Sequence, residues 1–100
     1  MNNDFVLFKR LLRLFGNHLD PAPQSLREFL VASDHIALYG LAHSLKGEAA
    51  TLGIDVIAVA AEELCQSIKG GHAEAYRVRT EALVQACETV QEQMKALADP

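Results

Sequence analysis

The segment Ala42-His43-Ser44-Leu45-Lys46-Gly47 combines a histidine, a lysine and a glycine, and Gly53 follows six residues later. In an α-helix, residues three and four apart share a surface, so His43, Lys46 and Gly47 would lie close together on one strip. A glycine in a helix interior costs about 1 kcal/mol relative to alanine. Local stability therefore does not explain Gly47, which favours contact between this strip and another molecule.

The chemistry open to such a strip is that of a single imidazole. Neutral histidine is a nucleophile near pH 7 and can take a phosphoryl group on a ring nitrogen. That transfer requires in-line approach of the donor and neutralisation of charge on the phosphoryl oxygens. Lys46 could contact those oxygens, and Gly47 would leave space for the loops of a partner.

The apolar residues around His43 predict the direction in which it points. At about 100° per residue, the positions opposite His43 are apolar and form the face that the helix must bury. These positions are Leu38, Leu41, Leu45, Ala49 and Leu52, with Ala42 just beyond them. His43 would then project outward, with Ile36, Tyr39, Lys46, Gly47 and Ala50 as its neighbours. Small and apolar neighbours are typical of a docking surface. The alternative is a surface histidine that merely follows the helical pattern.

The remaining histidines do not predict a metal site or a hydrolytic site. No two of His18, His35, His43 and His72 form an H-x-x-x-H pair, and His35 lies two turns, about 12 Å, from His43. We expect His18 and His72 to be solvated turn residues. The sequence has no glycine-rich phosphate loop after a strand and no source of an oxyanion hole. An ATP-using or hydrolytic site within this chain is therefore not expected.

The composition favours one helical domain. Half of the 100 residues are hydrophobic and 6% are aromatic. Alanine and leucine dominate the apolar half, which favours helix packing over a β-sandwich. A chain of this length suits a single core, so we expect residues 1–100 to form one domain.

The charge pattern argues against nucleic acid and membrane partners. The formal net charge is −4, and no run of lysines or arginines is long enough to bind phosphates. No apolar run approaches the ~18–20 residues that would insert into a membrane. The N-terminus lacks the basic region of a secretory signal. Cys65 and Cys87 are too far apart for a C-x-x-C motif and suit a core, so we expect a reducing, cytoplasmic setting.

The apolar periodicity predicts five helices. The first runs from residue 3 or 4 to about 18 and the second over 24–32, before an N-cap at Ser33-Asp34. The third ends at Gly53, and the others cover about 55–69 and 73–98. Short connections between long amphipathic helices imply antiparallel neighbours. The expected fold is therefore all-α, an antiparallel up-down four-helix bundle with an additional N-terminal helix.

The first and last helices are each expected to bury an apolar stripe. In the first helix, the predicted inward-facing residues are Leu7, Leu11, Leu14 and Phe15, with Phe5 and Phe8 covering one end. In the last helix, they are Tyr76, Leu83, Val84, Cys87, Val90, Met94 and Leu97.

The segment His43-Ser44-Leu45-Lys46-Gly47 with Leu52-Gly53 resembles the signature of histidine-containing phosphotransfer (HPt) domains, which reads H-x-[LI]-K-G followed by a second glycine. The resemblance extends over the whole chain. Residues 5–15 are similar to the opening helix of the HPt modules at the C-termini of hybrid sensor histidine kinases, and Ile57, Ala61 and Leu64 match the apolar repeat of a later helix.

The resemblance implies a phosphorelay intermediate. His43 would accept a phosphoryl group from a receiver-domain aspartate and pass it to another receiver, with electrostatic help from Lys46 and close approach permitted by Gly47. Expected partners are the receiver domains of response regulators and a hybrid sensor histidine kinase. The chain would be a phosphohistidine carrier without kinase activity, cofactor or metal of its own, since the required Mg²⁺ would belong to the receiver.

We expect the receiver to contact Ile36, Tyr39, Gly40 and Ala50, although Ile36 or Tyr39 could instead pack against a neighbouring helix. Two positions depart from the family pattern. Glu48 stands where a small residue is commoner, and we interpret it as a carboxylate at the edge of the core. Cys65 stands where the family often has Glu or Gln facing the histidine helix, which puts in doubt a hydrogen bond to His43 from this position.

Two other functions fit the same residues. One is a kinase-substrate domain of the chemotaxis-kinase type, phosphorylated directly by an ATP-binding domain. The other is an adaptor bundle that binds receivers without being phosphorylated, for which binding would persist while labelling fails.

Overall fold

The computed structural model describes residues 2–98, and the side chains of residues 4–97. Within this range the chain forms five α-helices and no strand. The helices are α1 (Asn2–Leu19), α2 (Ala22–Val31), α3 (His35–Leu52), α4 (Asp55–Lys69) and α5 (Tyr76–Ala98), with a short 3₁₀ helix, η1 (Ala73–Ala75), before α5. The all-α prediction is confirmed. The predicted last helix is divided, because its first three residues form η1 instead of α-helix.

Local capping fixes both ends of α3. The Asp34 side chain accepts a hydrogen bond from the backbone N–H of Ala37 at 3.1 Å, as expected of an N-cap. At the other end Gly53 has a φ of +74°, a left-handed conformation that glycine adopts without a steric penalty. Both caps were predicted from the sequence, and together they set which residues α3 contains.

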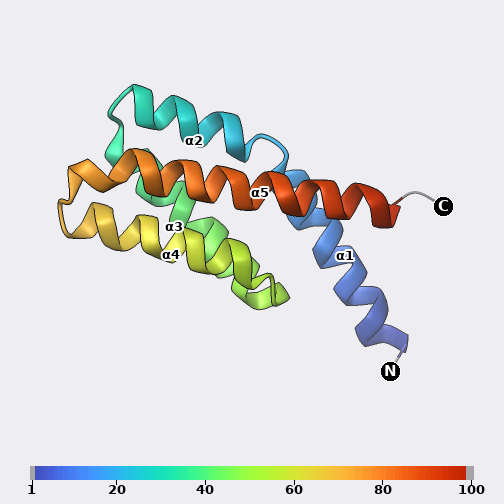
Figure 1. Ribbon diagram of the computed structural model, residues 1–100. Coiled ribbons are helices and arrows are strands. Elements are labelled where there is room, and N and C mark those ends of the chain that lie inside the picture. Colours follow the sequence, from blue (N-terminus) through green and yellow to red (C-terminus); the bar gives the residue numbers. More distant parts are fainter. Residues whose placement is uncertain (1, 99–100) are drawn as a thin grey trace.

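Four of the helices pack side by side as a bundle (Figure 1). Helix α3 lies against α2 and α4, and α5 also lies against α2 and α4, so that α3 and α5 are diagonal to each other. The connections are short, at residues 32–34, 53–54 and 70–75. Figure 1 shows the chain turning back at each of them.

The core of this bundle draws on every helix. Helix α3 buries Leu38, Ala42, Leu45 and Ala49 on one face, and Leu41 and Leu52 pack partly against the same cluster. The predicted inner face of the histidine-bearing helix is therefore confirmed. The other fully buried large side chains include Leu19, Leu26, Ile57, Leu64, Leu83 and Val84.

The predicted buried stripe of the first helix is wrong over most of its length. Phe15 is buried, but the structure leaves exposed Phe5, Leu7, Phe8, Leu11 and Leu14. Figure 1 shows why: the C-terminal end of α1 lies against the bundle, whereas its N-terminal half extends away from the other helices. Leu97, predicted to face inward, is 79% exposed near the end of α5, which also extends past its neighbours.

Cys65 and Cys87 are free thiols in the core, as predicted. Burial raises the pKa of Cys87 to about 12 and also raises that of Cys65 above its ordinary value. Both thiols therefore stay protonated near neutral pH and act as small apolar residues. Separately, no helix between residues 2 and 98 combines the length and the apolar character that crossing a membrane requires.

Two leucine substitutions measure the difference in burial between α3 and the N-terminal half of α1. Leu45 is fully buried, so Leu45→Ala should lower the free energy of unfolding by about 2–5 kcal/mol. Leu7 is more than half exposed, so Leu7→Ala should change it by no more than about 0.5 kcal/mol. Urea denaturation followed by circular dichroism measures both. Equal losses for the two variants would contradict the packing described for α1.

Candidate functional site

His43 lies exposed on the outer face of α3, opposite the residues that the helix buries. Its orientation follows from the core, because Leu45 and Ala42 must face inward and a rotation of about 100° per residue then turns His43 outward. The prediction that His43 points to solvent is confirmed.

The imidazole of His43 lies beside the ring of Tyr39. The two rings are stacked, with centroids 5.8 Å apart and planes 9° from parallel. Tyr39 is half-buried and packs against the core, whereas Ile36 is 88% exposed. Thus Tyr39 packs within the bundle and still borders the histidine, while Ile36 stays free. Within residues 4–97, no side chain hydrogen-bonds to the His43 ring, so its nitrogens are open to an incoming group.

Lys46 lies one turn after His43 and forms an ion pair across the boundary between α3 and α4. Its Nζ donates to Oε1 of Glu62 at 3.0 Å, and Gln66 Nε2 donates to the other carboxylate oxygen at 2.9 Å. The hydrogen bond and charge of Glu62 raise the pKa of Lys46, and the bonds from Gln66 and Lys46 lower the pKa of Glu62. Both groups are therefore charged near neutral pH.

Glu62 and Gln66 were not predicted from the sequence. They lie four residues apart on α4, which makes them neighbours on one face of that helix. Their pairing on α4 could have been predicted from this spacing. Their contact with Lys46 could not, because it depends on how α4 packs against α3. Cys65 is buried on the same helix and does not hydrogen-bond to His43. The polar side chain at this boundary is thus Glu62, and it contacts Lys46 instead of His43.

Two glycines border His43 on the outer face of α3. Gly40 and Gly47 are both exposed, and a Cβ added at either position would meet nothing within 4 Å. Neither glycine is therefore needed for packing within the chain. Exposed Ala50 lies one turn further on, so none of these three positions adds a large side chain beside the imidazole.

His18 was predicted to be solvated, and this prediction is wrong. Its Nδ1 lies 2.6 Å from Oε1 of Glu48, and this partly buried hydrogen bond ties the end of α1 to α3. Glu48, interpreted as a carboxylate at the core edge, is thus a link between helices. His72 is exposed, as predicted. His35 is exposed and makes an edge-to-face contact with Tyr76, with ring centroids 4.9 Å apart.

Taken together, the site combines an exposed imidazole, a lysine cation one turn along the helix and two exposed glycines. No group of three or more His, Cys, Asp or Glu side chains suited to a metal ion occurs in the described part of the chain.

The chain matches a known protein family. The family described as Hpt domain matches residues 10–99. The chain therefore belongs to the HPt domain family, which confirms the resemblance seen in the sequence and implies involvement in phosphorelay signalling. No curated protein and no solved structure matches the chain.

The ion pair predicts a change in the titration of Lys46. Glu62→Gln removes the carboxylate that favours the lysine cation, so the pKa of Lys46 should fall toward its ordinary value. NMR titration of the lysine Cε and Nζ resonances measures it. Glu63→Gln is the matched control, because Glu63 pairs with Arg79 and should leave Lys46 unchanged. An unaltered titration of Lys46 in Glu62→Gln would show that the pair does not form in solution.

Proposed function

We propose that His43 accepts a phosphoryl group from the aspartyl phosphate of a receiver domain and passes it to the aspartate of another receiver. The observation that carries the proposal is the exposed imidazole, without a hydrogen bond from residues 4–97, within the H-x-[LI]-K-G motif of an HPt domain. The protein is on this account a phosphohistidine carrier.

In each transfer, one bond forms and one breaks. A lone pair on a ring nitrogen of neutral His43 attacks phosphorus in line with the aspartyl oxygen. The N–P bond forms as the P–O bond breaks, and the bonding electrons leave with the aspartate carboxylate. The reverse sequence, with a carboxylate of the second receiver as nucleophile, restores free histidine.

The neighbours of His43 have distinct roles in this proposal. Lys46, a cation near neutral pH, stabilises charge on the phosphoryl oxygens, and its pairing with Glu62 further favours the charged form. Gly47 lets the receiver loops reach the imidazole, which is supported by the open space over it. The Mg²⁺ that phosphoryl transfer requires is held by the receiver.

The docking surface in this proposal is the outer face of α3. Ile36, Tyr39, Gly40 and Ala50 contact the receiver, and the exposed side chain of Ile36 is the apolar centre of that contact. The partners are receiver domains of response regulators, with a hybrid sensor histidine kinase as one source of them, in the cytoplasm. The proposal takes residues 1–100 as one domain, an antiparallel up-down four-helix bundle with an added N-terminal helix, which the short connections support.

The assignment of His43 predicts the result of two matched substitutions. His43→Gln should fold normally, because the side chain is exposed, and should accept no label from a receiver domain charged with labelled acetyl phosphate and Mg²⁺. His72→Gln replaces another exposed histidine and should accept label like the wild type. Autoradiography after rapid mixing measures both.

If His43→Gln still accepts label, the phosphoryl acceptor is another residue. A wild-type chain that binds the charged receiver but takes no label would instead be an adaptor. Labelling only by a histidine-kinase core with ATP would identify the chemotaxis type of substrate domain.

The role of Gly47 is tested by adding a side chain. Gly47→Gln should stabilise the fold by up to about 1 kcal/mol, because it removes a helical glycine at an uncrowded position. It should nevertheless slow transfer from the receiver by obstructing its approach. Ala82→Gln places the same side chain on α5, which does not contact α3, and should transfer at the wild-type rate. Stopped-flow transfer kinetics compare the two, and equal rates would refute the role of Gly47 in clearance.

A further inference from the structure

A second surface of the molecule lies on the free half of α1. Phe5, Phe8, Leu12, Phe15 and Leu19 follow one another at intervals of three, four, three and four residues, the spacing of a helix that packs along another helix. Leu19 and Phe15 are 0% and 3% exposed, Leu12 is half-buried, and Phe8 and Phe5 are 44% and 64% exposed. The stripe is continuous, but the chain covers only its C-terminal end.

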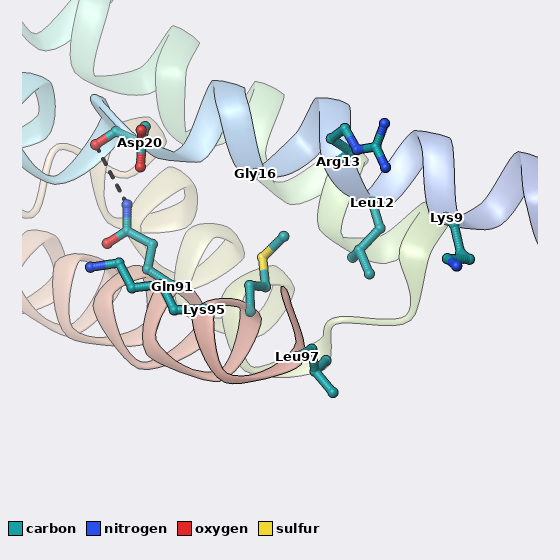
Figure 2. A pocket seen from close by; sticks show the side chains of 9 residues that line it. Lys9, Leu12, Arg13, Gly16, Asp20, Gln91, Lys95 and Leu97 are labelled. Carbon is teal, nitrogen blue, oxygen red and sulfur yellow. Dashed lines mark hydrogen bonds between the residues drawn. The ribbon is translucent and has the colours of Figure 1, made fainter. Parts of the chain in front are cut away.

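An open groove lies between α1 and the end of α5 (Figure 2), and Leu12 is the stripe residue that lines it. The helices meet at Gly16, where an added Cβ would lie 2.9 Å from Cε at the flexible end of the Met94 side chain. Beyond this point they diverge and leave a hollow of about 360 Å³. Leu12 and Leu97 line it from opposite walls.

The rim of the groove is basic. Lys9 and Arg13 border it on α1 and Lys95 borders it on α5, while Asp20 lies at the closed end. The whole chain has a net charge of −4, so the local charge at this rim is opposite in sign to the net charge of the molecule. An acidic partner would be attracted to this site more than to any average part of the surface.

We propose that this groove binds an amphipathic helix of another protein, with an apolar stripe flanked by aspartates or glutamates. The apolar lining of Leu12, Met94 and Leu97 suits the apolar stripe of a helix, and the basic rim matches acidic flanks. A second copy that pairs α1 with α1 would place Lys9 and Arg13 opposite the same cations, which disfavours self-association. The proposal does not depend on the phosphoryl chemistry of His43.

The test uses two synthetic helical peptides with the same leucine stripe, one with glutamates and one with lysines at the flanking positions. The full chain should bind the glutamate peptide at least about tenfold more tightly than the lysine peptide, and added salt should weaken the binding. Fluorescence anisotropy measures it. Cross-peaks of Leu12, Met94 and Leu97 should shift in NMR spectra during the titration.

Two variants assign the binding to the groove. The double reversal K9E/R13E should lose the preference for the glutamate peptide, whereas K69E/R77E makes the same charge change at exposed positions away from the groove and should keep it. Leu97→Ser should weaken both peptides without affecting the fold, because Leu97 is 79% exposed.

Three results would overturn the proposal. The first is equal affinity for the two peptides, or no binding of either. The second is a concentration-dependent dimer in sedimentation velocity that Leu97→Ser abolishes, which would assign the groove to a second copy. The third is binding to phosphatidylcholine–phosphatidylglycerol vesicles in preference to the glutamate peptide, which would assign it to a membrane surface.

Discussion

The burial of one face of α3 is the constraint on which the rest of the structure depends. Leu38, Ala42, Leu45 and Ala49 are withdrawn from water by α2 and α4, and each buried leucine contributes about 1.5–3 kcal/mol. Asp34 and Gly53 fix the ends of the helix. Since a helix cannot turn its inner face out without losing these contacts, the opposite face is held toward solvent. The exposed imidazole is therefore a product of core packing and requires no loop to present it.

The ion pair near the imidazole contributes less to stability than the buried core does. The pair between Lys46 and Glu62 is partly exposed to water, and exposed pairs contribute little to stability. It places the lysine head group at the boundary between α3 and α4. On the proposed function, helix α3 carries the nucleophile and Lys46 is the adjacent cation. On the proposed function, the remaining groups of the reaction come from the receiver.

Sequence periodicity predicted the helices, the caps of α3 and the face that it buries, because these depend on residues close together in the chain. It predicted the wrong environment for Phe8 and Leu97, since periodicity identifies a helix face but not how far the neighbouring helices extend along it. It also missed the bonds from His18 to Glu48 and from Lys46 to Glu62. Those contacts join separate helices, and their geometry is set only when the bundle is assembled.

The central claim is that a ring nitrogen of His43 carries the phosphoryl group. ³¹P NMR of the wild-type chain, after mixing with a receiver domain charged by acetyl phosphate, tests it most directly. The account predicts a phosphoramidate resonance that disappears in acid, survives in base and couples to the imidazole nitrogens of His43 in ¹⁵N-labelled protein. A phosphoryl resonance assigned to another side chain, or none despite binding of the charged receiver, would contradict it.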